Sequence, residues 1–119
     1  MVYFVVPRNE KITSEQKRKS MKLNSKQRQY LKGLGHSLKP VIQVGKDGLS
    51  QQVLSSISKA LDDHELIKIN ILETADIERE QASSILTSAL NAEVIQTLGR
   101  KILLFRRNNE KQKIEIPQQ

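Results

Sequence analysis

An isoleucine-rich run at residues 66–72 is the feature that most constrains the fold of this 119-residue chain. Ile67, Ile69 and Ile71 occupy alternate positions, which is typical of a strand with one face in a core. Apolar residues recur with helical spacing on both sides of this run. The helix before the run follows Ser50, a plausible N-cap, and the helix after the run extends from about Asp76 to Leu90. A strand between two such helices predicts an α/β fold, because each helix must bury its apolar side against a sheet.

Further elements extend this pattern in both directions. Apolar residues at Leu23, Tyr30, Leu31 and Leu34 predict a first helix, with Ser25 as N-cap and Gly35 as its end. Pro40 then favours an extended entry into a strand at residues 41–44. Two more strands, at 94–98 and 102–106, flank a predicted hairpin turn around Gly99. The order predicts a single compact α-β-α-β-α-β-β domain with a four-stranded mixed sheet.

The chain divides by composition into three parts. Residues 1–20 are predicted to be a flexible basic N-terminal extension, 21–107 the folded domain, and 108–119 a C-terminal tail. The tail could hold a short strand at 114–116, but Pro117 and the polar end predict fraying. Core positions are expected at Tyr30 and Phe105 and, on the third helix, at Ile77, Ala82, Ile85, Leu86 and Ala89.

A Gly-x-x-Gly sequence, Gly45-Lys46-Asp47-Gly48, joins the first strand to the second helix. Glycine lets a ligand approach the main chain closely, the amides of the following helix favour an anion, and Lys46 adds a positive charge. The alternative is a plain turn, for which Asp47 and Gly48 are suitable residues. A nucleotide-binding P-loop is disfavoured, because its remaining glycine and its Ser or Thr are missing.

The net charge of +7 is unevenly distributed. Residues 1–48 carry eleven basic and three acidic residues, 49–93 carry three and eight, and 94–119 carry six and two. If the two basic ends meet in space, they form a positive face that attracts polyanions. The first helix carries Lys22, Lys26, Arg28 and Lys32 with no acidic residue among them, so its polar face is predicted to be uncompensated positive charge.

Several other classes of function are disfavoured. The chain has no cysteine, so disulfides and sulfur-ligated zinc are excluded, and no run approaches the roughly 20 apolar residues of a membrane span. His36 follows the end of the first helix, where a capping role is the commoner explanation. His64 stands among acidic residues at a helix-to-strand turn, where a solvated corner is favoured over a metal site. We therefore expect no enzyme, no metal and no cofactor.

Residues 23–48, LNSKQRQYLKGLGHSLKPVIQVGKDG, and residues 64–68, HELIK, together resemble the bacterial YhbY-type proteins, which are stand-alone copies of the CRM (chloroplast RNA splicing and ribosome maturation) domain. The resemblance covers about residues 21–107 and implies a fold similar to the C-terminal domain of bacterial translation initiation factor 3. Small bacterial members usually begin near Met21, so residues 1–20 are either a true extension or an upstream start.

The resemblance also implies an RNA-binding surface on the first helix, the Gly-x-x-Gly loop and the end of the last strand. We add Lys22 from the same helix and two residues from the predicted hairpin. Asp47 is expected to weaken the loop's positive charge. The predicted RNA-binding residues are Lys22, Lys26, Arg28, Lys32, Gly45, Lys46, Asp47, Gly48, Arg100, Lys101 and Arg106.

The resemblance implies a protein that binds ribosomal RNA in precursors of the large ribosomal subunit and assists their assembly. The absence of cysteine fits a reducing cytoplasm, and we expect a cytoplasmic monomer. The four aromatic residues, Tyr3, Phe4, Tyr30 and Phe105, provide no stacking platform like that of an RRM, so contacts to phosphate and RNA shape are expected to dominate. Two alternatives remain open. One is an adaptor that docks a protein partner through the acidic middle segment, and the other is a general nucleic-acid binder.

Overall fold

The computed structural model describes residues 23–117, so Lys22 and the predicted extension over residues 1–20 lie outside it. Three helices and four strands alternate along the described chain, and the predicted fold class is confirmed. In chain order the elements are α2 (Ser25–Gly35), β1 (Ile42–Val44), α3 (Gln51–His64), β2 (Leu66–Ile71), α4 (Arg79–Leu90), β3 (Glu93–Leu98) and β4 (Lys101–Phe105).

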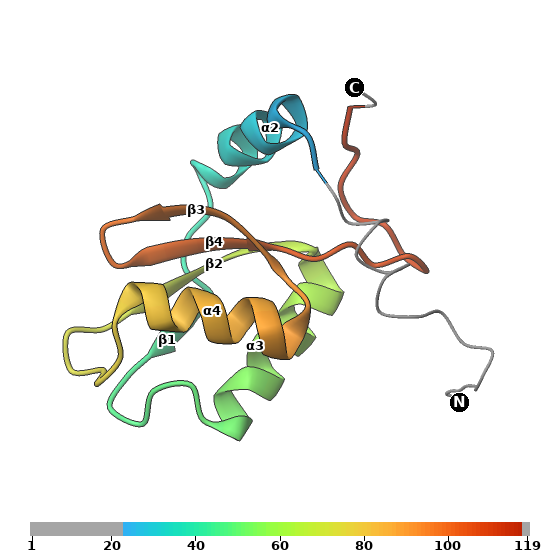
Figure 1. Cartoon of the computed structure of the whole chain (residues 1–119). Helices are drawn as coiled ribbons and strands as arrows, with labels where there is room; N and C mark the ends of the chain where they lie inside the picture. Colours follow the sequence, from blue (N-terminus) through green and yellow to red (C-terminus); the bar gives the residue numbers. More distant parts are fainter. Residues whose placement is uncertain (1–22, 118–119) are drawn as a thin grey trace.

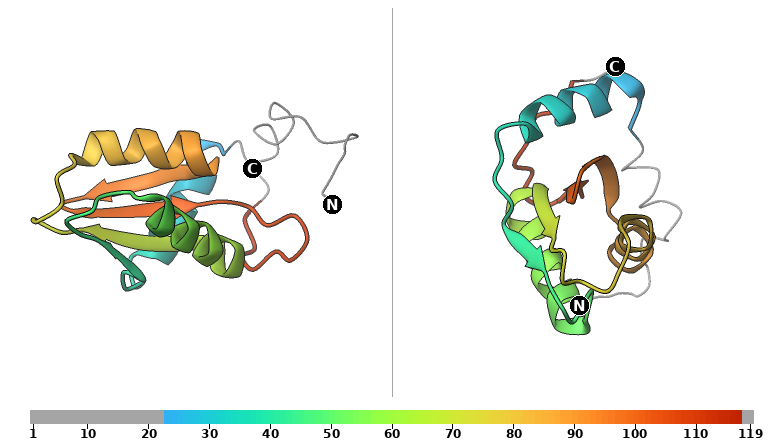
Figure 2. Two further views of the ribbon diagram at one scale, coloured as in Figure 1. Left: turned by 90° about the horizontal axis from the view of Figure 1, so that it is seen from below. Right: turned by 90° about the vertical axis from the view of Figure 1, so that its left-hand side faces the viewer.

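The strands form one mixed sheet in the order β1-β2-β4-β3. β1 is parallel to β2, whereas β4 runs antiparallel to both β2 and β3. Figure 1 shows α2 on one face of this sheet and α3 and α4 on the other, and the end view in Figure 2 shows the same three layers. Each face of the sheet therefore supports its own apolar cluster.

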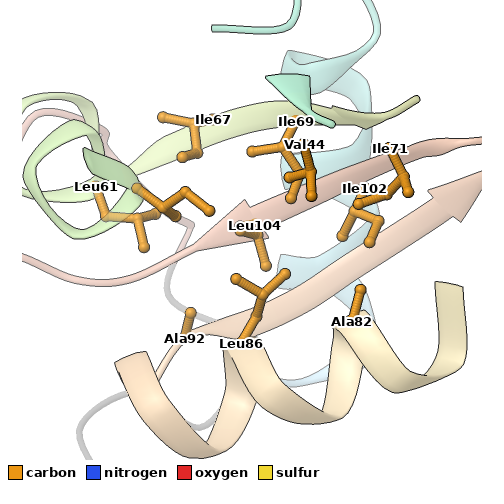
Figure 3. Close-up of a cluster of buried hydrophobic side chains, with 11 residues drawn as sticks. Val44, Leu61, Ile67, Ile69, Ile71, Ala82, Leu86, Ala92, Ile102 and Leu104 are labelled. Carbon is orange, nitrogen blue, oxygen red and sulfur yellow. The ribbon is translucent and has the colours of Figure 1, made fainter. Parts of the chain in front are cut away.

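The larger cluster fills the space between the sheet and the α3–α4 layer (Figure 3). Ile67, Ile69 and Ile71 all point into it, as their alternation predicts. α4 contributes only Ala82 and Leu86 as fully buried residues, whereas Ile85 and Ala89 are exposed, so those two core predictions are wrong. The buried stripe of α4 is narrow, because only Ala82 and Leu86, four residues apart, form it. Ile85 directly precedes Leu86 and is therefore about 100° around the helix from it.

The smaller cluster lies between the sheet and α2, and its buried members are Leu31, Leu66, Ile95, Leu103 and Phe105. Phe105 is in the core as predicted, but Tyr30 is 41% exposed, which corrects the prediction that it is buried. The buried side of α2 carries Leu31 and Gly35, four residues apart, and this spacing turns Tyr30 outward.

Local hydrogen bonds set the helix ends. α2 is capped by Asn24 rather than by Ser25: Asn24 Oδ1 accepts from the Gln27 amide at 2.8 Å, and Gln27 Oε1 accepts from the Asn24 amide at 3.0 Å. This reciprocal pair satisfies two amides at once. Ser50 caps α3 as predicted. α4 begins at Arg79, three residues after the predicted start.

The C-terminal segment folds back onto the domain instead of fraying. Its anchor is Glu65, which is fully buried and has a φ of 66°. The Glu65 carboxylate accepts hydrogen bonds from the amides of Asn108, Lys113 and Ile114 and from the Arg107 guanidinium. Residues 114–116 form no strand, which corrects that prediction. Ile114 and Ile116 instead pack against the smaller cluster.

Candidate nucleic-acid interface

The Gly-x-x-Gly sequence forms a tight turn at the end of β1. The Gly48 amide donates to the Gly45 carbonyl at 2.9 Å, and Gly48 has a φ of 65°, a conformation that favours glycine. Lys46 and Asp47 occupy the tip of the turn and are exposed. The sequence is thus a turn by conformation, as the alternative predicted. Its exposed lysine can still contact a ligand.

The β3–β4 hairpin lies at the same end of the sheet as this turn. Because β1 and β2 are parallel and β4 is antiparallel to β2, the ends of β1 and β2 meet the beginning of β4. Backbone bonds of 2.9 Å from the Leu72 amide to the Val44 carbonyl and 2.8 Å from the Ile71 amide to the Arg100 carbonyl tie these segments together. Figure 1 shows the turn and the hairpin at the same, left-hand end of the sheet, with the loop from β2 to α4 between them.

Three predicted site residues gather there, namely Lys46, Arg100 and Lys101, and we call them the basic end. All three are exposed. Within residues 23–117 none of them forms an ion pair, although Arg100 lines a surface pocket together with Glu78 and Glu80. α3 begins close by, after Ser50, and has no acidic residue in its first turn. Its N-terminal dipole therefore adds to the positive potential.

The predicted residues of α2 differ in their surroundings. Lys26 is exposed and Lys32 half-buried, and neither forms an ion pair within the described chain. Arg28, by contrast, pairs with Glu93 of β3 and also donates to the Val94 carbonyl at 3.3 Å. The prediction of a fully uncompensated helix face is therefore wrong. A carboxylate 65 residues away in the sequence neutralises Arg28 and fastens α2 to the sheet.

Arg106 lies at the opposite end of β4 from the basic end. Its guanidinium donates to the carbonyls of Leu90 and Ser58, each at 2.9 Å, and to Asp62 Oδ1, also at 2.9 Å. Only 17% of its side chain is exposed. Arg106 thus joins the last strand to α3 and α4. The structure does not bring it together with the other predicted RNA-binding residues.

Two further lysines extend the positive surface beyond the predicted set. Lys39 and Lys68 line a groove of about 490 Å³ whose walls are otherwise mostly apolar, including Leu34, Leu38 and Val41. Lys68 sits in a strand recognised only by its buried isoleucines. The alternation that buries those isoleucines also turns Lys68 to the opposite face, and this is the signal that could have identified it.

Other kinds of site find no support in the described chain. Between residues 23 and 117 there is no cluster of three His, Cys, Asp or Glu side chains that could hold a metal ion. In the same region no helix is long and apolar enough to cross a membrane.

Comparison with known proteins identifies the family. The family model of the CRS1 / YhbY (CRM) domain matches residues 23–106. The chain belongs to this family. The resemblance predicted from the sequence is confirmed, and the match covers every helix and strand of the described domain.

Several members of the CRM family are similar to the chain along most of its length. "Probable RNA-binding protein YqeI" of Bacillus subtilis is 32% identical over 95 residues, which cover 80% of this chain and 99% of the relative. An "RNA-binding protein" of Haemophilus influenzae is 40% identical over 98 residues, covering 80% of this chain and 95% of the relative. The solution structure of SAV1595 from Staphylococcus aureus, described as "a putative RNA binding protein", has a TM-score of 0.68 and 31% identity, covering 81% of this chain and all of that one.

Proposed function

We propose that this CRM-domain protein binds RNA, specifically ribosomal RNA in precursors of the large ribosomal subunit, and that it assists their assembly without catalysing a reaction. The RNA-binding part of the proposal is supported by the names of its relatives. The ribosomal part extends the family resemblance. Such a protein would act in the cytoplasm, and as a monomer.

The observation that carries the proposal is the gathering of Lys46, Arg100 and Lys101 at one end of the sheet. They come from segments more than 50 residues apart in the sequence, yet they are exposed and without an ion pair in the described chain. Cations of this kind release counterions from a nucleic acid when they contact its phosphates, and this release supplies most of the non-specific affinity.

The ion pairs weigh against the adaptor alternative. Five of the eight acidic residues between positions 49 and 93 pair with a basic side chain inside the domain, and they are Asp62, Asp63, Glu65, Glu80 and Glu93. Glu78 is the N-cap residue of α4, and its backbone amide donates to Gln81 Oε1 at 3.1 Å. Of these residues, Glu65 is fully buried and Glu93 is about one-third exposed, so at least these two are unavailable or only partly available to a basic partner.

The test is sedimentation of a cell extract that contains the tagged protein. The protein is expected to migrate with immature large subunits, and the Lys46→Glu/Arg100→Glu variant is expected to move to the soluble fractions. Wild-type protein found only in the soluble fractions at low salt would contradict the ribosomal proposal. Competition between duplex DNA and ribosomal RNA fragments tests the alternative of a general nucleic-acid binder, which predicts equal affinity for both.

A further inference from the structure

The sheet face toward α2 is only partly covered. α2 ends at Gly35, and this glycine lies directly against Leu103, in the middle of β4. Leu103 is opposite Lys68 on β2 and Gln96 on β3, so the helix stops above this cross-strand row. The next row toward the basic end lies beyond the last turn of α2.

That next row crosses all four strands. Gln43 is opposite Asn70, Asn70 is opposite Lys101, and Lys101 is opposite Leu98. Directly opposed residues point to the same face of a sheet, so these four side chains stand side by side on the α2 face. We call them the open row. With strands about 4.8 Å apart, the open row extends over roughly 14 Å.

The open row is accessible and chemically unusual for a sheet face. Gln43 and Lys101 are exposed, Asn70 is half-buried and Leu98 is 69% exposed. Within residues 23–117 the side-chain amides of Gln43 and Asn70 have no hydrogen-bond partner. Each amide offers both a carbonyl acceptor and an NH₂ donor. Two such groups on adjacent strands match the mixed donor and acceptor edge of a nucleobase.

The strands contribute mainly basic residues to the face that carries the open row. Lys101 belongs to the row, Lys46 and Arg100 lie at the adjacent end of the sheet, and Lys68 lies in the neighbouring row. The four described strands contain a single acidic residue, Glu93, and it is paired with Arg28 at the far end of the sheet. A negatively charged chain could therefore lie across this face without meeting an unpaired strand carboxylate.

We propose that the open row is a base-recognition subsite for unpaired nucleotides of the bound RNA. Gln43 and Asn70 hydrogen-bond to base edges, Leu98 contacts a base or ribose face, and the basic end holds the flanking phosphates. Unpaired bases are favoured over a duplex because the deep, narrow major groove of A-form RNA cannot be reached from a flat sheet. This inference rests on the proposed RNA binding and adds the residues that select sequence.

The first test measures the affinity of the full chain for three labelled 12-nucleotide RNAs made only of A, C or U, by fluorescence anisotropy. An amide paired with a base edge discriminates between bases by about fivefold to about 150-fold. We therefore expect the wild-type affinities to differ by at least about fivefold. The Gln43→Met/Asn70→Leu variant keeps side-chain size but removes both amides. Its affinities for the three RNAs are expected to lie within about twofold of one another.

The salt dependence of binding separates this subsite from phosphate contacts. The double variant should keep the wild-type slope, because it removes no charge, whereas Lys46→Glu should weaken all three RNAs alike. The single variant Gln43→Met, on an exposed position of an edge strand, serves if the double variant does not fold. NMR of the wild-type protein adds an independent reading, in which the side-chain NH₂ signals of Gln43 and Asn70 shift on addition of the preferred RNA.

Three outcomes would contradict the proposed subsite. The first is equal wild-type affinities for the three RNAs. The second is unchanged discrimination between the RNAs in the folded double variant, and the third is that the NH₂ signals of the wild-type protein do not shift. In each of these cases RNA is still bound, so the proposed function stands and only the subsite fails. If the wild-type protein binds none of the RNAs and no ribosomal RNA fragment, the proposed function itself fails.

Discussion

Gly35 and Leu103 approach each other so closely that a Cβ added to Gly35 would lie 2.4 Å from Leu103 Cδ2. Both residues are buried. This contact draws the last turn of α2 onto the middle of β4, and it determines how much of the sheet the helix covers. The open row begins where this contact ends.

Substitution Gly35→Ala is expected to destabilise the fold by about 1–2 kcal/mol. Overpacking a core costs about 1–3 kcal/mol, and the better helix propensity of alanine returns at most about 1 kcal/mol. Gly33 lies two residues away in the same helix and has open space around it. Gly33→Ala should therefore stabilise the protein by about 0.5–1 kcal/mol. Urea unfolding measures the free energy of unfolding of both variants. Equal changes in the two variants would contradict the packing argument.

Substitution Glu65→Gln is expected to lower the free energy of unfolding by about 2–4 kcal/mol, because it removes the charge that pairs with Arg107 and sets an NH₂ group against the Asn108 amide, which donates to Oε2. Hydrogen exchange should show loss of protection at the Asn108 amide, which donates to Oε2 of this carboxylate. The control is Glu115→Gln, an exposed carboxylate in the same segment. Unchanged protection in Glu65→Gln would show that the carboxylate does not hold the segment.

Substitution Arg106→Ala separates a structural role from an RNA contact. It should cost about 2 kcal/mol of stability, because it leaves the Leu90 and Ser58 carbonyls without their donor. At a temperature where the variant is folded, its RNA affinity should change by less than about twofold, because Arg106 is expected to make no contact with phosphate. Loss of a phosphate contact would reduce the affinity by more than this. Arg100→Ala should behave in the opposite way, with unchanged stability and weaker binding. A large loss of affinity in folded Arg106→Ala would restore it to the RNA surface.

Hydrophobic periodicity was sufficient to predict the order of elements. Ile67, Ile69 and Ile71 alternate because one face of β2 is buried, and that signal is local. The outward position of Tyr30 and the exposure of Ile85 could not be predicted in this way. Each depends on which side of a helix meets the sheet, and contacts distant in the sequence decide that.

The candidate site was predictable only as a set of residue types. Lys46, Arg100 and Lys101 could be named from the sequence, but their proximity follows from the parallel β1–β2 pair and the antiparallel β2–β4 pair. The ion pairs of Arg28 and Arg106 join residues 65 and 44 positions apart. No local pattern in the sequence distinguishes such a neutralised arginine from a free one.

The salt dependence of RNA binding should reflect the free cations. The five predicted cations without an ion pair in the described chain are Lys26, Lys32, Lys46, Arg100 and Lys101. If all five contact phosphate, the slope of log K against log salt concentration should be roughly −3 to −5. Titrations of a ribosomal RNA fragment between 50 and 200 mM salt, about the range in which this effect is large, measure it. A flat response would exclude phosphate contacts as the main source of affinity.

The most direct test of the proposed RNA surface is a charge reversal at the basic end, Lys46→Glu/Arg100→Glu, compared with Lys59→Glu. Lys59 has an 80% exposed side chain in the C-terminal half of α3, whereas the N-terminus of α3 is the end that lies close to the turn. We predict that the double variant loses at least about tenfold in affinity for a ribosomal RNA fragment and that its salt slope falls by about 1.5–2. The affinity of Lys59→Glu for the same RNA fragment should stay within about threefold of the wild-type affinity, because a general loss of positive charge produces only a small change. Equal losses at the two places would contradict the account, because RNA would then be responding to net charge and not to the basic end.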